Sequence, residues 1–164
     1  MKNKLVYLFP VLLWVGVIFF FSSQTYQQQT IIPELKGSLS EDRLSERLPD
    51  LTIRYHDAEL NARQNPFHFV EFLFRKSAHL FVYGILGALL FLGLRSFRLQ
   101  GWGKAMLVLG GGALVAIIDE LNQAQSLTRK GLPQDVLVDV AGVAFGMLFA
   151  ALLTVALRKM EEET

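Results

Sequence analysis

Ionisable side chains interrupt the long apolar stretches of this sequence at three places. The first group is Lys76, His79 and Tyr83, whose i, i+3, i+7 spacing places them on one helix face. The other two groups lie on either side of the connection between the third and fourth apolar stretches. They are Asp119, Glu120 and Gln123, and then Asp135 and Asp139 preceded by Arg129 and Lys130. Because charge within a spanning helix is costly, such residues usually mark a functional site or a buried ion pair.

These residue types favour the binding of an anionic group. Lys76, His79 and Arg129 would hold a phosphate or a carboxylate, and the arginine fork suits both in a bidentate manner. The acidic residues Asp119, Glu120, Asp135 and Asp139 would orient these cations, with Tyr83 and Gln123 completing the binding set. An ion-pair lock with a purely structural role is the alternative interpretation.

A catalytic interpretation uses the same residues. His79 would act as general base or nucleophile, Asp135 or Asp119 would orient it, and the cations would stabilise a phosphoryl transition state. A metal-dependent version would use a mixed nitrogen and oxygen ligand set for a divalent metal such as Zn²⁺ or Mn²⁺. Its ligands would be His79, Asp119, Glu120 and Asp139. No HExxH or GxSxG motif identifies a reaction, and no cofactor is otherwise expected.

Composition places these groups in a membrane protein. Of 164 residues, 52% are apolar and only 19% are charged, and there is no cysteine to serve as a nucleophile or ligand. A spanning helix needs roughly 17–25 mostly apolar residues. We therefore expect an all-α, four-transmembrane-helix bundle in a single domain, 1–164. Its spans are residues 5–24, 67–95, 102–122 and 133–157, and a partly helical loop, 25–66, joins the first two.

The charges outside these spans predict the orientation. Lys and Arg gather beside the termini and in the short connection between the second and third spans. The bias of basic residues towards the cytoplasm predicts a multi-pass protein of the bacterial cytoplasmic membrane with both termini inside. The first span is read as an uncleaved anchor, because no A-x-A-like site follows it. Since spans alternate in direction, all three polar groups then meet at the level of the outer leaflet.

Two signals mark helix starts around the loop. Ser38 and Glu41 have capping-box spacing and predict a short amphipathic helix, which Pro49 would end. Asn65 and Pro66 predict the start of the second spanning helix, with proline at its first position. The formal net charge of +1 gives no indication of a nucleic-acid partner. A transporter is disfavoured because no internal repeat is evident.

The same motifs resemble those of the VanZ-like family. The segment Arg75–Gly87 resembles R-K-x-x-H-x-x-x-Y-x-x-L, and Asp119–Gln123, followed by Arg129 and Asp135, resembles D-E-x-x-Q…R…D. The run Phe21–Gln24 resembles the F-S-S-Q that ends the first span in this family.

This resemblance implies a small four-helix integral membrane protein. The founding member of the family is associated with low-level resistance to teicoplanin, a lipoglycopeptide that acts at the outer membrane surface. The resemblance thus implies membrane lipids, a cell-wall precursor or a lipoglycopeptide as partners. Our leading hypothesis is an accessory protein that binds an anionic lipid headgroup or lipoglycopeptide. The alternative is a membrane-embedded hydrolase or transferase acting on a lipid phosphate.

Overall fold

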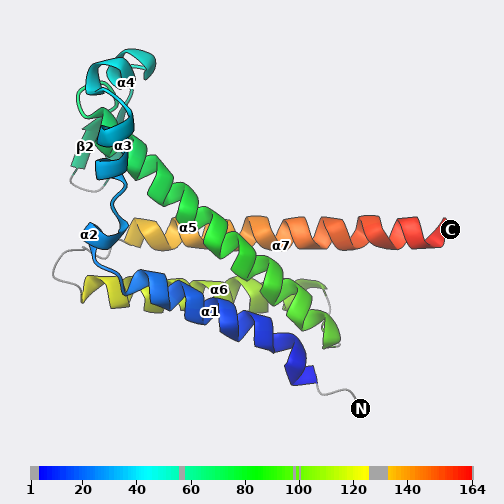
Figure 1. The fold of residues 1–164 in the computed structure, drawn as a ribbon. Coiled ribbons are helices and arrows are strands. Elements are labelled where there is room, and N and C mark those ends of the chain that lie inside the picture. The colour runs from blue at the N-terminus through cyan, green and yellow to red at the C-terminus, as the bar shows by residue number, and fades with distance from the viewer. Residues whose placement is uncertain (1–3, 56–57, 98, 100, 126–132, 164) are drawn as a thin grey trace. The chain divides into compact units, whose positions relative to one another are not determined.

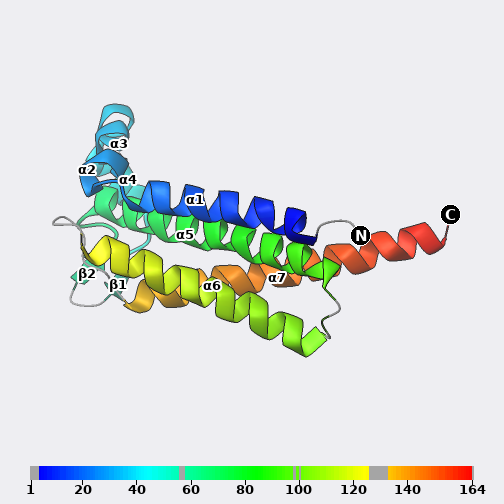
Figure 2. The same ribbon diagram turned by 90° about the horizontal axis from the view of Figure 1, so that it is seen from below.

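The computed structural model describes residues 4–55, 58–97, 99, 101–125 and 133–163. It separates into two compact units (Figures 1 and 2). The bundle unit comprises Met1–Ser23 and His79–Thr164, and the loop unit comprises Gln24–Ala78. Arg129 and Lys130, which the sequence assigns to the candidate site, lie outside the described residues.

Helices form all the regular structure described in the bundle unit. In chain order they are η1 (Lys4–Leu8), α1 (Phe9–Ser22), the second part of α5 (Pro66–Gly93), η2 (Leu94–Ser96), α6 (Gly101–Ala124) and α7 (Pro133–Glu162). Helix α6 packs against both α1 and α7. Figure 2 shows that α1 and α6 end where α7 begins, so these three termini share one end of the unit.

Three helices are long and apolar enough to cross a membrane by themselves, namely Pro66–Ser96, Gly101–Ala124 and Pro133–Glu162. A fourth span is counted only when Val6–Ser22 is taken together with Tyr26–Ser38. The prediction of an all-α membrane bundle is therefore confirmed. The third apolar run forms a helix of 24 residues, which includes polar residues at both ends.

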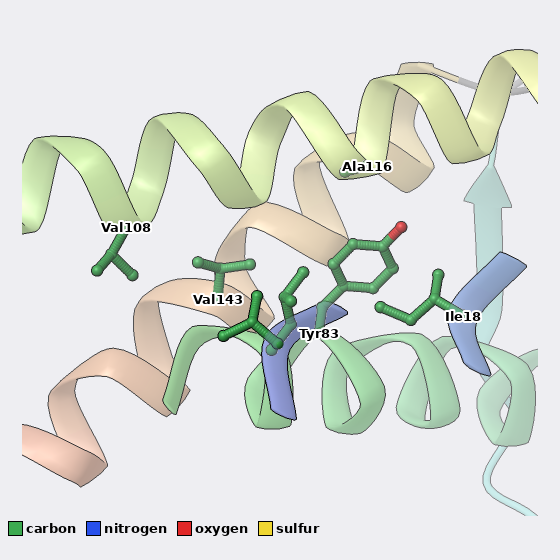
Figure 3. Close-up of a cluster of buried hydrophobic side chains, with 7 residues drawn as sticks. Ile18, Tyr83, Val108, Ala116 and Val143 are labelled. Atoms are coloured by element: carbon green, nitrogen blue, oxygen red, sulfur yellow. The ribbon is translucent and has the colours of Figure 1, made fainter. Parts of the chain in front are cut away.

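A small apolar core joins the helices of the bundle unit (Figure 3). It contains Val11, Ile18, Tyr83, Leu86, Val108, Ala116 and Val143. By contrast, many large apolar side chains on the same helices face outwards, including Leu12 at 69% and Phe149 at 67% exposure. Exposed apolar surface on this scale is expected where lipid, rather than water, surrounds the helices.

The loop unit combines short helices with one hairpin. Its elements before α5 are α2 (Tyr26–Gln29), α3 (Ile32–Ser38), α4 (Glu41–Arg47), β1 (Thr52–Tyr55) and β2 (Ala58–Asn61). The strands are antiparallel, with Thr52 opposite Asn61. Glu71 on α5 is only 3% exposed and accepts hydrogen bonds from the Tyr26 hydroxyl at 2.6 Å and the Ile31 amide at 3.2 Å. These bonds connect α5 to the first segments of the loop unit. Burial and this carboxylate raise the pKa of Tyr26, so its phenol remains a donor.

The structure confirms one helix start in this region and corrects the other. Helix α5 begins at Pro66 as predicted. The capping box predicted at Ser38 and Glu41 is wrong, because Ser38 is the last residue of α3 and Ser40 is the N-cap of α4, without a side-chain cap. The amphipathic helix itself is present as α4 and ends before Pro49. A capping box forms instead between Thr25 and Gln28.

Candidate polar site between the helices

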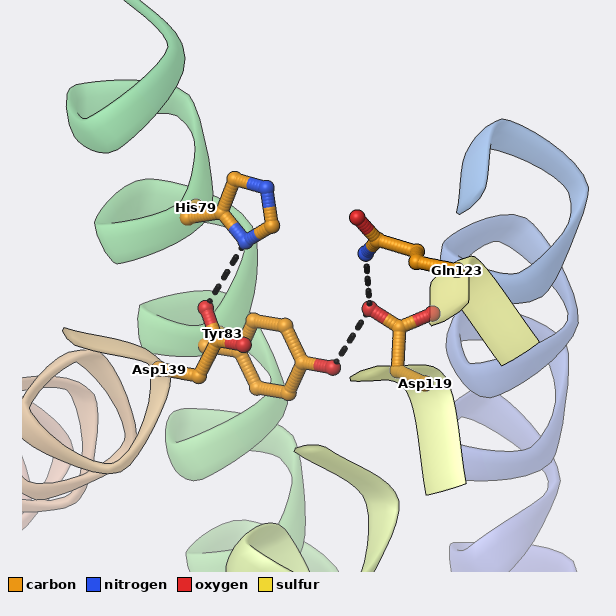
Figure 4. Close-up of polar contacts among 5 residues, drawn as sticks. All are labelled: His79, Tyr83, Asp119, Gln123 and Asp139. Atoms are coloured by element: carbon orange, nitrogen blue, oxygen red, sulfur yellow. Dashed lines mark hydrogen bonds and ion pairs between the residues drawn. The ribbon is translucent and has the colours of Figure 1, made fainter. Parts of the chain in front are cut away.

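Two side chains from different spanning helices form an ion-pair contact inside the bundle unit (Figure 4). His79 Nδ1 on α5 lies 2.9 Å from Asp139 Oδ1 on α7. When Asp139 is ionised its carboxylate only accepts, so Nδ1 is the donor in this contact. The Asp139 side chain is 0% exposed and that of His79 is 21% exposed. The buried acid therefore orients a histidine ring that reaches the accessible edge of the bundle.

A second contact ties α5 to α6. The Tyr83 hydroxyl donates to Asp119 Oδ2 at 3.0 Å, and Gln123 Nε2 donates to the same oxygen at 3.2 Å. Tyr83 is 1% exposed, Asp119 2% and Gln123 5%, so this network is closed to solvent. Figure 4 shows Asp119 and Gln123 facing His79 and Asp139 from opposite sides of Tyr83. We call His79, Tyr83, Asp119, Gln123 and Asp139 the polar cluster.

Close packing of α5 on α7 positions the His79–Asp139 pair. A Cβ atom built on Gly142 would lie 2.5 Å from the Leu80 carbonyl oxygen, and one built on Gly146 would overlap the Gly84 carbonyl. Only glycine allows backbones to approach this closely, as in GxxxG interfaces of membrane helices. Gly142 lies three residues after Asp139, on the same helix face. The glycine contact therefore brings Asp139 within reach of α5.

Two other predicted site residues, Glu120 and Asp135, lie on α6 and α7. Glu120 is 7% exposed and lies next to Asp119 on α6. Asp135 lies in the first turn of α7 and acts electrostatically on Asp139. Within the described residues, Asp119 Oδ1 and Asp139 Oδ2 are buried and lack a hydrogen-bond partner. A buried acceptor without a donor lowers the stability of the fold, so a further donor to either carboxylate would be stabilising.

Lys76 belongs to the loop unit. Its Nζ atom lies 4.3 Å from the centroid of the Tyr55 ring and 5.5 Å from that of Phe72. Arg75 lies similarly over Tyr26, at 5.4 Å. Cation–π contacts such as these hold each head group near an aromatic face.

The sequence patterns did not predict two side chains, Asn122 and Trp14, that form hydrogen bonds between α1 and the helices α6 and α5. The Asn122 amide is within 3.4 Å of Ser22 Oγ and 3.5 Å of Ser23 Oγ at the end of α1. Trp14 Nε1 donates to the Val82 carbonyl at 2.9 Å. The signal for the first contact was available: the Ser-Ser pair follows the first apolar run and Asn122 follows the third, and in a chain whose spans alternate in direction these two ends lie at the same level.

The described part of the chain contains no group of three or more His, Asp or Glu side chains that could hold a metal ion. The ligand set that the sequence suggested, His79 with Asp119, Glu120 and Asp139, is therefore not gathered around one point. The arrangement observed is a pair of oriented contacts, one His–Asp and one Tyr–Asp, and no metal step is derived from it.

The VanZ/LLP1 family model matches residues 7–154, which include the whole loop unit and most of the bundle unit. None of the curated proteins and none of the solved structures compared with the chain matches it.

Proposed function

Because the chain is a membrane protein of the VanZ/LLP1 family, we propose that its polar cluster binds the anionic group of a cell-envelope amphiphile. The shared chemistry is a phosphate or carboxylate attached to an apolar tail, as in an anionic lipid, a lipid-linked cell-wall precursor or a lipoglycopeptide. The proposal places the cluster at the outer leaflet, with both termini in the cytoplasm.

The observation that carries this proposal is the His79–Asp139 pair. A buried carboxylate behind Nδ1 stabilises the imidazolium, whose Nε2–H then points away from Asp139 as a donor. Such a charge-assisted hydrogen bond to an anion is about twice as strong as a neutral one. In surroundings of low dielectric the bond is less weakened by water.

Arg129 supplies the second cation in this proposal. It precedes α7 by four residues, so the chain limits its distance from the end of the bundle that carries Asp135 and Asp139. Its guanidinium has five donors, enough to serve both a ligand anion and a buried carboxylate oxygen. Asp119 and Asp139 would then offset the cations when no ligand is bound, which explains an acid-rich site for an anionic ligand.

Binding to the purified full-length protein in neutral detergent tests the proposal. The probes are a short-chain phosphatidic acid, the matching diacylglycerol without phosphate, and teicoplanin as a lipoglycopeptide. We expect the phosphatidic acid or teicoplanin to bind and the diacylglycerol not to bind.

His79→Gln and Arg129→Gln should each weaken binding about tenfold or more, equivalent to about 1.4 kcal/mol. The exposed His68 and Arg54 provide matched controls, His68→Gln and Arg54→Gln. Unchanged affinity in both site variants would refute the proposal.

The His79–Asp139 contact also supports a second candidate, a membrane-embedded hydrolase or transferase. A neutral His79 with its proton on Nδ1 has a basic Nε2, which could take a proton from water as that water attacks a lipid phosphate. Asp139 occupies the orienting position on Nδ1, a role that the sequence suggested for Asp135 or Asp119. Release of phosphate or a headgroup from the bound phosphatidic acid, lost in His79→Gln, would establish catalysis. Binding without product would establish the accessory role.

A further inference from the structure

A second set of cations lies at the opposite end of the bundle unit from the polar cluster. Arg95 follows α5 in η2, Lys104 lies in the first turn of α6, and Arg158 lies in the last part of α7. Arg95 and Arg158 are both close enough to Lys104 to act on it electrostatically. Three separate helical segments therefore bring like charges together.

Within the described residues, none of these three cations forms an ion pair. Glu161 and Glu162 follow Arg158 at i+3 and i+4, the spacing of helical ion pairs, yet no such pair is formed. Like charges gathered without a counter-charge repel one another. An anion bound among them would remove this repulsion.

The Lys104 side chain is oriented by an aromatic ring. Its Nζ atom lies 3.6 Å from the centroid of the Phe91 ring on α5, a cation–π contact that joins α5 to α6. The side chain is half-buried, whereas Arg95 and Arg158 are exposed. An ammonium group positioned in this way loses less conformational entropy when it binds a ligand.

The first turn of α6 adds backbone donors beside Lys104. The N-terminus of a helix favours anions because its first amides lack helical partners and carry the positive end of the dipole. Gly101 and Gly103 lie in this turn, and a Cβ atom on either would meet nothing within 4 Å. Packing therefore does not explain these glycines, and an approaching headgroup can reach the backbone here.

Apolar side chains next to this turn are exposed. Trp102 is 79% exposed and Met106 is 57% exposed on α6, and Leu157 beside Arg158 is 51% exposed. Tryptophan is enriched at the membrane interface, and apolar residues beside it suit acyl chains. These side chains favour a phospholipid over a free phosphate ion.

We propose that Arg95, Lys104, Arg158 and the first turn of α6 bind the phosphate of an anionic phospholipid. Trp102 lies at the level of the headgroup, and the acyl chains follow the exposed apolar face of α6. Under the orientation proposed above, the lipid belongs to the cytoplasmic leaflet. Basic sites between spanning helices on that side are a recurring way to recognise anionic lipids. The site is independent of the polar cluster and uses none of its residues.

Native mass spectrometry of the full-length protein tests this proposal. The probes are dioleoyl phosphatidylglycerol, dioleoyl phosphatidylcholine and inorganic phosphate, each at the same concentration in neutral detergent. We expect phosphatidylglycerol to be retained well above the other two. In the His79→Gln background, which weakens binding at the polar cluster, Lys104→Gln and Arg95→Gln should each reduce this retention about tenfold, whereas Lys104→Arg should keep most of it.

Lys159→Gln is the matched control, because it removes one positive charge next to Arg158 on the same helix without being one of the charges that act on Lys104. His79→Gln is expected to bind phosphatidylglycerol at this site normally, which separates this proposal from the function proposed above. Equal retention in Lys104→Gln, Arg95→Gln and Lys159→Gln would overturn the proposal. Equal binding of inorganic phosphate and phosphatidylglycerol would overturn the assignment to a lipid.

Discussion

Tyr83 carries the one hydroxyl of the polar cluster and is 1% exposed, and the role of this hydroxyl can be measured by removing it. In Tyr83→Phe, Asp119 Oδ2 loses the donor at 3.0 Å and keeps only Gln123. A buried charged acceptor deprived of a donor costs about 1–3 kcal/mol. We therefore expect the free energy of unfolding, measured in detergent by denaturant titration, to fall by about that amount.

Tyr7→Phe is the control for this change, because the Tyr7 side chain is 47% exposed. The same loss of a hydroxyl should change its unfolding free energy by less than about 0.5 kcal/mol. Equal effects of the two substitutions would mean that the Tyr83–Asp119 hydrogen bond contributes nothing to the fold.

The contact of α5 with α7 depends on glycine at the points of closest approach. In Gly146→Ala the new methyl group would collide with the backbone at Gly84, and a backbone atom cannot move aside without separating the helices. Overpacking of this kind costs about 1–3 kcal/mol. We expect a lower melting temperature and weaker binding of the anionic probe, because Asp139 would move away from His79.

Gly110→Ala makes the same substitution where a Cβ would meet nothing within 4 Å. Alanine favours a helix over glycine by up to about 1 kcal/mol, so this control should be neutral or slightly stabilising. If Gly146→Ala were equally neutral, the packing of α5 on α7 would not be what positions the His79–Asp139 pair.

The elements that could be predicted from sequence are those with a strong local signal. Proline at the first position predicted the start of α5, and long apolar runs predicted both α5 and α7. Helical spacing and alternating span direction predicted that these residues lie at one level, but not the contacts of His79 with Asp139 and of Tyr83 with Asp119. Which acid meets His79 depended on the glycine contact, and spacing alone left Asp135 and Asp119 as alternatives.

The loop unit was less predictable because its short segments depend on contacts distant in sequence. The hairpin of β1 and β2 has only four residues in each strand, too few for a clear alternating pattern. Glu71 connects to Tyr26 and Ile31 across at least 40 residues, and nothing in its local sequence indicates burial. The start of α4 was also misplaced, because its N-cap is Ser40 and not Ser38.

The orientation of the whole molecule in the membrane is a prediction. Because the chain has no cysteine, single cysteines introduced at chosen positions can test it. The exposed Glu46 on α4 and Lys159 near the end of α7 are suitable single-cysteine positions. We expect Glu46→Cys to react with a membrane-impermeant thiol reagent added to intact cells, and Lys159→Cys to react only after lysis. The reverse pattern would place the polar cluster at the inner leaflet and the basic lipid site at the outer one.

The central claim is that residues from separate spans and from the connection before α7 meet at one anion-binding site. Cross-linking of the double variant His79→Cys/Arg129→Cys in native membranes with a short bifunctional thiol reagent measures this directly. We expect efficient intramolecular cross-linking, and none in the control His79→Cys/Lys159→Cys, whose positions lie near opposite ends of the bundle unit. If both cysteines of the first variant react with monofunctional reagent but do not cross-link, Arg129 is not part of the site and the account is contradicted.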